Sequence, residues 1–271
     1  MHGVGNDYVY FNCLTEELKN PQALAVRLSK RRFSIGGDGI ILICKSKIAD
    51  AKMRIFNADG SEGKTCGNGI RCVAKWLYDF KKVDRKELKI ETLAGVKRLW
   101  VSVGEDEKVD GVKADMGSAN FSFEAIPALF SGENTPQKTL FVLGKEYKVT
   151  CVSMGNPHCV VFAPAPEPFE EIGRAFETHS VFPEGVNTEF ATKNQDGSFF
   201  VRVWERGSGE TLACGTGACA VAAAAVKNGY AKAGQDIKIL LKGGVITVNY
   251  TEERVFMTGP AVLSYTGVVE I

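Results

Sequence analysis

The sequence has no long apolar run, few histidines and no excess of charge of either sign. No stretch of about 18 or more consecutive apolar residues occurs, so a membrane-spanning helix is not expected. Lys and Arg number 33 and Asp and Glu 32, a net charge of +1, which leaves no basic footprint for nucleic acid or an anionic membrane. The N-terminus lacks a basic segment followed by an apolar one, so no signal peptide is expected. We therefore expect a cytoplasmic protein that binds neither nucleic acid nor membrane.

The sequence also lacks the cysteine spacing of a zinc site. Its eight cysteines stand at positions 13, 44, 66, 72, 151, 159, 214 and 219, and only three histidines accompany them. Cys66 and Cys72, like Cys214 and Cys219, are too far apart for the usual Cys-x2-Cys pairs, so no metal is predicted. Because 45% of the 271 residues are hydrophobic, a disulfide framework is not needed, and reduced thiols fit better.

What the sequence does contain is one pattern written twice. Asp59–Cys72 reads DGSEGKTCGNGIRC, and Arg206–Cys219 reads RGSGETLACGTGAC. Sliding the chain against itself by about 148 to 150 residues, the separation set by Cys66 and Cys214, brings further landmarks together in the same order: Gly5-Asn6 with Gly155-Asn156, followed by the similar Val9-Tyr10 and Val160-Val161, then Arg54–Phe56 with Arg202–Trp204, Asn57 with Glu205, and Glu62 with Glu210. An ordered internal repeat of this kind predicts two domains of one design.

The hydrophobic patterns predict similar elements in the two halves. Segments rich in β-branched and aromatic residues indicate strands, and hairpin-like turns indicate antiparallel pairing. A helix is expected over residues 21–32, one with a single apolar face over 67–80, and one that is apolar all round, and therefore buried, after Cys214. We predict an α/β (α+β) fold with two pseudo-symmetric domains, each a mostly antiparallel sheet wrapped around a central helix.

The domain boundary is expected near residues 115–120. Residues 1–115 form the first predicted domain and residues 116–258 the second. Residues 259–271 are expected to return to the first domain as a strand, because a short end strand needs a partner sheet.

The two Cys-Gly-x-Gly motifs each precede a predicted helix. Free N–H groups and the dipole at a helix start favour a carboxylate or a thiolate, and the glycines let the backbone approach a ligand. A helix start contributes at most about 2 kcal/mol, or roughly 1.5 pK units, to a thiol whose ordinary pKa is about 8.5. Removing a proton from carbon therefore needs a contribution beyond that of the helix start. We expect it from desolvation as the site closes and from a nearby imidazole, for which His158 is the candidate.

A pseudo-twofold arrangement would place the two thiols on opposite sides of one ligand in an interdomain cleft. One thiolate would then remove a proton from a carbon, and the opposite thiol would deliver a proton to the other face. The result is inversion of a stereocentre with neither cofactor nor redox step. The alternative is that both cysteines are only packed in the core, which is our expectation for the remaining six.

Five segments resemble signatures of the diaminopimelate epimerase family, in that family's order: HGVGNDYVYFN, FNADGSEGKTCGNGIRC, MGNPH, EGVNTEF and WERGSGETLACGTGACA. The family is grouped with cofactor-independent racemases and epimerases such as proline racemase. The resemblance implies interconversion of LL- and meso-2,6-diaminopimelate in lysine and peptidoglycan precursor synthesis. It also implies two similar α/β domains, a two-thiol mechanism without a cofactor, and a homodimer.

The same resemblance assigns roles to individual residues. Cys66 matches the proton donor and Cys214 the acceptor in the LL-to-meso direction, while His158 and Glu205 match the pair that tunes the thiols. The positions that match substrate-binding residues are Asn6, Asn57, Gly67, Asn68, Asn156, Asn187, Glu205, Arg206, Gly215 and Thr216. Tyr265 resembles a dimer-interface tyrosine, and Gly39 stands where some members carry a substrate-contacting Gln, so that contact is not expected.

Rival hypotheses make different predictions. A racemase of the proline or hydroxyproline type would turn over an amino acid with a single α-carboxylate. It would have little use for Arg206, which is expected to bind a second, distal carboxylate. A thiol redox or metal-binding module would show a Cys66–Cys214 disulfide or bound zinc. An amino-acid-binding protein without catalysis would not need the thiol pair, and phenazine-pathway isomerases lack it.

Overall fold

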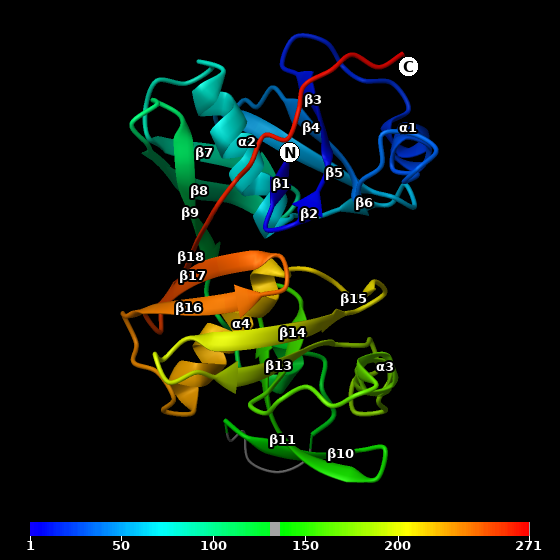
Figure 1. The fold of residues 1–271 in the computed structure, drawn as a ribbon, viewed down its shortest axis with the longest axis vertical. Coiled ribbons are helices and arrows are strands. Elements are labelled where there is room, and N and C mark those ends of the chain that lie inside the picture. The colour runs from blue at the N-terminus through cyan, green and yellow to red at the C-terminus, as the bar shows by residue number, and fades with distance from the viewer. Residues whose placement is uncertain (131–135, 271) are drawn as a thin grey trace. The chain divides into compact units, whose positions relative to one another are not determined.

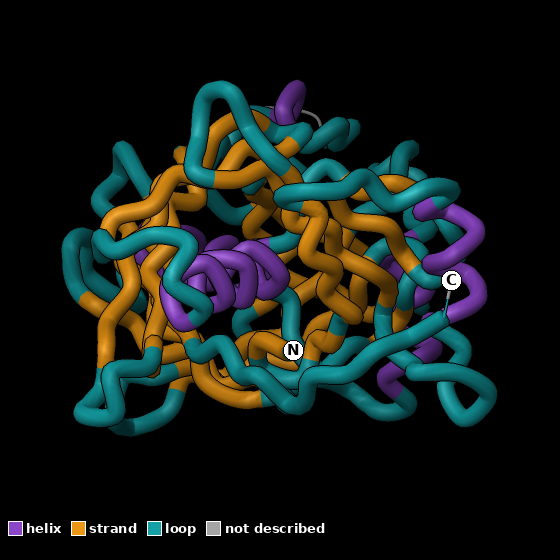
Figure 2. The backbone as a smooth tube through the Cα atoms, turned by 90° about the horizontal axis from the view of Figure 1, so that it is seen from above, coloured by secondary structure: helices purple, strands orange, loops and turns teal. Residues whose placement is uncertain are grey.

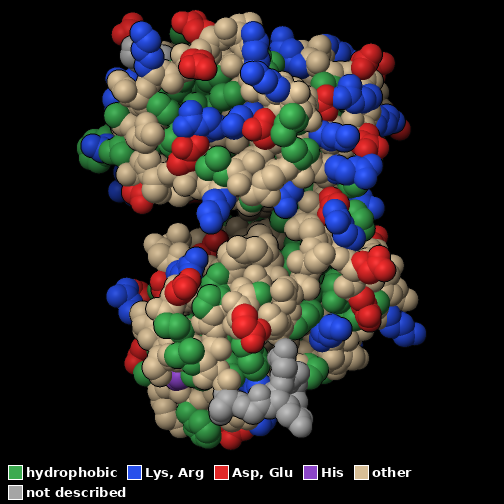
Figure 3. All heavy atoms as spheres, turned by 180° about the vertical axis from the view of Figure 1, so that it is seen from behind, with side chains coloured by type: hydrophobic (Ala, Val, Ile, Leu, Met, Phe, Trp, Pro, Cys, Tyr) green, Lys and Arg blue, Asp and Glu red, His purple; other side chains and the backbone are tan. Residues whose placement is uncertain are grey.

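Two units make up the computed structural model, which describes residues 1–130 and 136–270. Unit 1 contains Met1–Asp115 and Thr258–Ile271, and unit 2 contains Met116–Met257 (Figure 1). Acidic and basic side chains are mixed on the face drawn in Figure 3. Among the described residues, no helix has both the length and the apolarity needed to cross a membrane.

Unit 1 is a sheet built around helix α2 (Gly67–Asp79), which contacts strands of the sheet and the hairpin of β1 (His2–Gly3) and β2 (Asn6–Asp7). The strands of the sheet lie in the order β3 (Val9–Cys13), β4 (Gly39–Cys44), β5 (Ala51–Asn57), β7 (Glu87–Thr92), β8 (Gly95–Val103) and β9 (Val109–Gly117), with β6 (Glu62–Gly63) paired to β5. Helix α1 (Pro21–Leu28) buries Leu24, Ala25 and Leu28 in a cluster with residues of β4 and β5.

Unit 2 repeats this plan around helix α4 (Gly215–Lys227). Its strands lie in the order β10 (Lys138–Val142), β11 (Lys145–Ser153), β12 (Pro157–Val161), β13 (Asn187–Lys193), β14 (Phe199–Glu205), β16 (Asp236–Leu241), β17 (Gly244–Tyr250) and β18 (Val255–Gly259), with β15 (Gly209–Glu210) paired to β14. Helix α3 (Phe169–Glu177) packs Phe169, Ile172 and Phe176 into an aromatic cluster with Phe190 and Trp204. A short 3-10 helix spans Phe123–Ala125.

The central helices confirm the predicted relation between pattern and burial. Every residue of α4 from Gly217 to Ala225 is buried, as its continuous apolar sequence predicts. Helix α2 instead leaves Trp76 and Tyr78 partly exposed near its end. Figure 2 shows a helix enclosed by strands, in agreement with the predicted fold class.

Strand pairing shows how closely the halves repeat. In unit 1, β3–β4 and β5–β7 are parallel and the other printed pairs of the sheet are antiparallel. In unit 2, β12–β13 and β14–β16 are the parallel pairs. Ile40 pairs with Phe56, and Thr188 pairs with Trp204 at the matching place. Val9 pairs with Ile40, and Cys159 pairs with Thr188, which is the equivalent of Ile40 in unit 2. Val9 is therefore equivalent to Cys159, and the predicted alignment of Val9 with Val160 is wrong by one residue.

Two predicted elements are shorter in the structure. The first helix ends at Leu28, before residue 32, because the chain turns back and Gly36 N donates to the Leu28 carbonyl. The predicted strand over residues 259–271 is wrong. Among the described residues 260–270, only Val262 makes a bridge, exchanging two backbone hydrogen bonds with His2, and the residues that follow it are largely exposed.

The segment after β18 is nevertheless held firmly in unit 1 by a buried guanidinium. Arg71 of α2 is fully buried, and its Nε donates to the Pro260 carbonyl at 3.3 Å. Its two other nitrogens donate to the Gly67 carbonyl and to Asn68 Oδ1 at the helix start. One side chain therefore connects the first turn of α2 to residues that follow unit 2 in the chain.

Candidate functional site

In unit 1, the start of α2 carries a thiol. Cys66 is the N-cap residue, with extended backbone angles, and its Sγ accepts a hydrogen bond from Gly69 N at 3.3 Å. Gly69 has little room for a side chain, because a Cβ there would lie 2.5 Å from Ile41 Cδ1. The cap therefore fixes the sulfur beside the N–H groups of the first turn, where negative charge is favoured.

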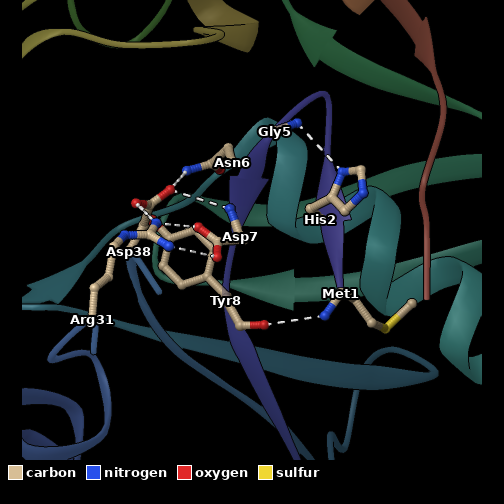
Figure 4. A network of polar contacts seen from close by, with 8 residues as sticks. All are labelled: Met1, His2, Gly5, Asn6, Asp7, Tyr8, Arg31 and Asp38. Carbon is tan, nitrogen blue, oxygen red and sulfur yellow. Dashed lines mark hydrogen bonds and ion pairs between the residues drawn. The ribbon is translucent and has the colours of Figure 1, made fainter. Parts of the chain in front are cut away.

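A hydrogen-bond network orients the group that faces Cys66. Asn6 Nδ2 donates to Asp38 Oδ2 at 2.7 Å, and the same carboxylate accepts from Asp7 N and pairs with Arg31 (Figure 4). Because a carboxylate only accepts, it fixes the Asn6 amide with its nitrogen toward Asp38. The amide oxygen then faces Cys66 Sγ at 3.4 Å, so the thiol is the donor of that bond.

Two of the other predicted residues of unit 1, Gly67 and Asn68, lie in the first turn of α2, and Asn57 lies at the end of a strand. Asn57 ends β5 and donates through Nδ2 to Ser61 Oγ at 3.0 Å. Asn68 is buried in the first turn of α2, next to Gly67, and accepts from Arg71. The Tyr10 hydroxyl reaches the Gly69 carbonyl at 3.5 Å.

In unit 2, the start of α4 repeats the cap with a buried thiol. Cys214 Sγ accepts from Gly217 N at 3.3 Å, as Cys66 does from Gly69. Thr216 Oγ1 lies 3.4 Å from the same sulfur, and either atom can be the donor. Burial raises the pKa of the Cys214 thiol well above its usual value, and the carboxylates of Glu205 and Glu189 act in the same direction.

A second chain of contacts leads from Thr216 into the interior. Asn156 Nδ2 is 3.4 Å from Thr216 Oγ1, and Asn156 Oδ1 is 3.1 Å from His158 Nε2. The other imidazole nitrogen, His158 Nδ1, is 2.7 Å from Glu189 Oε1, and both of these side chains are fully buried. His158, Asn156 and Thr216 were all expected at the site, whereas Glu189 was not.

Glu205 is a further carboxyl beside Cys214. Burial raises its pKa, while hydrogen bonds from Thr211 and Cys214 and the nearby His158 act in the opposite direction. The environment of Glu205 thus sets desolvation, which raises its pKa, against direct contact with the thiol, which lowers it.

Asn187 and Arg206 form a rigid corner at the ends of β13 and β14. Asn187 is buried, donates to the Pro157 carbonyl at 2.8 Å and accepts from Arg206 N at 2.9 Å. The Arg206 guanidinium donates to the Glu184 carbonyl at 2.8 Å. Backbone and side chain of Arg206 are therefore both oriented by neighbours in unit 2.

The repeat makes the chemical difference between the two half-sites plain. Strand register places Tyr8 of unit 1 where unit 2 has His158, and Ile41 where unit 2 has Glu189. No role for Glu189 or for Asp38 was predicted from the sequence. The sequence does give one indication of Glu189: it is a charged residue inside β13, a strand whose first five residues are all buried.

The remaining cysteines lie in or near the core. Cys44 is partly exposed, and five others are buried: Cys13, Cys72, Cys151, Cys159 and Cys219. No disulfide joins any two cysteines of the chain, all of which lie in the described ranges. Across residues 1–130 and 136–270, no group of three or more His, Cys, Asp or Glu is placed to hold a metal ion.

Comparison with known proteins identifies the family. A family model described as diaminopimelate epimerase matches residues 1–122 and 150–264. The chain belongs to the diaminopimelate epimerase family. Over 273 residues it is 46% identical to the diaminopimelate epimerase of Acetivibrio thermocellus, covering 100% of this chain and 97% of the relative. With the diaminopimelate epimerase of Bacillus mycoides it shares 47% identity over 276 residues, covering 100% of this chain and 96% of the relative.

This member of the diaminopimelate epimerase family is similar in fold to several solved structures. A hydroxyproline epimerase from Agrobacterium vitis, solved with bound trans-4-hydroxy-L-proline, matches with a TM-score of 0.67 and 17% identity, covering 96% of this chain and 87% of that one. A PhzF-family phenazine biosynthesis protein from Bacillus anthracis matches with a TM-score of 0.64 and 17% identity, covering 88% and 84%. At such identities the likeness concerns the fold, and it confirms the predicted two-domain α+β class.

Proposed function

We propose that this epimerase interconverts LL- and meso-2,6-diaminopimelate by passing protons between the substrate α-carbon and the thiols of Cys66 and Cys214, with no cofactor. The observation that carries the proposal is the repeated helix start, in which each thiol accepts from the third N–H of its helix. The family supplies the substrate, and its place is the synthesis of lysine and peptidoglycan precursors.

The hydrogen bonds of the half-sites support different roles for the two thiols. Asp38 fixes Asn6 so that Cys66 faces an amide oxygen, and a sulfur in that position keeps its proton. Cys214 instead faces the Thr216 hydroxyl, which can donate to a thiolate. Cys66 is accordingly the donor and Cys214 the acceptor in the LL-to-meso direction.

The proposed reaction requires both thiols to reach one α-carbon from opposite faces. The Cα–H bond breaks as Cys214 gains the proton, and the Cys66 S–H bond breaks as a new Cα–H bond forms on the other face. Helix-start N–H groups at Gly67, Asn68, Gly215 and Thr216 bind the α-carboxylate and stabilise the charge that develops on it. His158 and Glu205 adjust the proton affinity of the thiols.

The second amino-acid head of the substrate explains the remaining polar residues. Asn side chains both donate and accept, so Asn6, Asn57, Asn156 and Asn187 suit an ammonium and a carboxylate together. The Arg206 guanidinium binds the distal carboxylate through two hydrogen bonds. A substrate with one head would leave Arg206 unused.

The quaternary state and location follow the same proposal. The protein is a homodimer with Tyr265 in its interface; this tyrosine side chain is exposed in the single chain, at 62%. Two catalytic thiols must stay reduced, which the cytoplasm ensures. A small-molecule amino acid is the only partner that the proposed chemistry requires besides a second copy of the chain.

Solvent-deuterium exchange tests the mechanism. LL-diaminopimelate incubated in D2O with the wild type should give meso product that carries deuterium at the inverted carbon. Cys66→Ala and Cys214→Ala should both abolish inversion, with any residual exchange confined to LL substrate for Cys66→Ala and to meso substrate for Cys214→Ala. These patterns follow because each variant retains one thiol on one face of the carbon.

Matched controls lie one or two turns inside the same helices. Cys72→Ala and Cys219→Ala remove buried thiols that face the core and should retain turnover per folded molecule. Full turnover by Cys66→Ala or Cys214→Ala would refute the two-thiol mechanism. Preferred turnover of proline or 4-hydroxyproline would replace the proposed substrate with that of the related racemases.

A further inference from the structure

We propose that Glu189 is a positioning residue for this reaction, which sets the protonation of Cys214 through His158, Asn156 and Thr216. The inference rests on the function proposed above. Glu189 lies in β13, with its carboxylate 2.7 Å from His158 Nδ1 in a site where both side chains are fully buried. A carboxylate this deeply buried needs a charged or hydrogen-bonding partner, and the imidazole is that partner.

Four contacts join Glu189 to the thiol in a continuous chain. They run from Glu189 Oε1 to His158 Nδ1, from His158 Nε2 to Asn156 Oδ1, from Asn156 Nδ2 to Thr216 Oγ1, and from Thr216 Oγ1 to Cys214 Sγ. When His158 is an imidazolium, both of its nitrogens donate, so Asn156 must accept through Oδ1 and donate through Nδ2. Thr216 then accepts from Asn156 and gives its own proton to a Cys214 thiolate.

The opposite arrangement follows when His158 is neutral. With Nδ1–H kept on Glu189, Nε2 becomes an acceptor, and the Asn156 amide must turn over to donate to it. Thr216 then donates to Asn156 Oδ1 and can only accept from the Cys214 S–H. The two arrangements contain the same number of protons: imidazolium with thiolate, or imidazole with thiol.

Glu189 decides between these arrangements because it stabilises only the imidazolium by charge. The thiolate needs that help, since burial, Glu205 and Glu189 itself all raise the pKa of Cys214. The imidazolium that Glu189 stabilises must therefore outweigh the direct repulsion between the Glu189 carboxylate and the sulfur. The titratable groups facing this chain are His158 and Cys159 on β12, Glu189 on β13, Glu205 on β14, and Cys214 at the start of α4. Glu205 also contacts the Cys214 thiol directly, so it competes with Thr216 for the hydrogen bond to that sulfur.

The repeat argues that Glu189 is not present merely to fill space. The equivalent residue of unit 1, Ile41, occupies the same place beneath Gly69 with an apolar side chain. Beneath Gly217, a Cβ would lie 2.6 Å from Glu189 Oε1 and 3.3 Å from Cys214 Sγ. The Glu189 carboxylate therefore lies close beneath the start of α4, next to Cys214. The apolar Ile41 side chain lies at the equivalent place next to Cys66, so only the charge on Cys214 is set by a carboxylate in this position.

A double-variant cycle tests the proposal. Glu189→Gln keeps the size and an acceptor for Nδ1 but removes the charge, and Thr216→Val removes the last hydroxyl of the chain. We expect each to lower kcat for LL substrate by about a hundredfold, the low end of an acid–base contribution. We also expect the double variant to lose no more than either single variant, because both interrupt one chain. Multiplied losses would overturn the proposal.

An assay without substrate separates this inference from the proposed function. Nitrogen-15 NMR of labelled histidine, with His158→Gln used for assignment, reports the protons on each imidazole nitrogen. Wild type should show a protonated Nδ1 and, at a given pH, a larger imidazolium fraction than Glu189→Gln. An identical His158 titration in the two proteins would overturn the inference. A wild type unable to epimerise diaminopimelate would overturn the proposed function, and the NMR comparison would still decide the role of Glu189.

Discussion

Replacing Gly217 by alanine sets two opposing effects against each other. Alanine is the better helix former, worth about 1 kcal/mol over glycine in a helix interior. Against this, the new Cβ would lie 2.6 Å from Glu189 Oε1 and 3.2 Å from Cys214 Cβ. The carboxylate must move away, and this shift disturbs its 2.7 Å contact with His158.

The structure predicts which effect is larger. Separating a buried charged pair costs about 3–5 kcal/mol, because a charge is left without compensation. After subtraction of the helix-propensity gain, Gly217→Ala should lower the free energy of unfolding by about 2–4 kcal/mol. Gly69→Ala is the matched control. Its Cβ would lie 2.5 Å from Ile41 Cδ1, the end of an apolar side chain, so overpacking of about 1–3 kcal/mol less the propensity gain leaves a loss of about 0–2 kcal/mol.

Urea denaturation followed by circular dichroism and tryptophan fluorescence measures both variants. The midpoint for unit 2 should fall markedly in Gly217→Ala, and the midpoint for unit 1 should change less in Gly69→Ala. Separate transitions must be fitted if the units unfold independently. A Gly217→Ala protein as stable as the wild type, or more stable, would refute the reasoning, because propensity would then outweigh the buried pair.

Two further predictions concern pH and assembly. Burial raises the pKa of Glu205, so its contribution to stability is fully present below the ordinary value of about 4.3 and is lost as pH rises through the folded-state pKa. Glu205→Gln should therefore gain in urea midpoint relative to wild type as pH rises above that value, and parallel curves would contradict this assignment. Sedimentation velocity should give a dimer for the wild type and a shift toward monomer for Tyr265→Asp; a wild-type monomer at all concentrations would contradict the proposed interface.

Local sequence patterns predicted the elements that depend on local physics. The cysteine caps and the apolar faces of α2 and α4 are encoded within about four turns of helix, so the pattern alone indicates both helices. The repeat of Cys-Gly-x-Gly also brought Cys66 and Cys214 into one hypothesis. The family resemblance then supplied roles that no spacing could give.

Features that depend on distant partners were not predictable in this way. Glu189 is separated from His158 by 31 residues and meets it only because β12 and β13 pair in parallel register. Asp38 reaches Asn6 across a similar separation of 32 residues. The error over residues 259–271 has the same origin: a strand requires a free sheet edge, and the sequence does not reveal that this segment is held by a bridge to His2 and by the side chains of Arg71 and Arg27.

The buried Arg71 also has a consequence for the order in which the polypeptide matures on the ribosome. Its bond to the Pro260 carbonyl, and the exchange between His2 and Val262, use residues translated after all of unit 2. Unit 2 is continuous in sequence and can close as soon as it emerges, whereas unit 1 must wait with its helix start incompletely enclosed. The half that is synthesised first is therefore the half that is completed last.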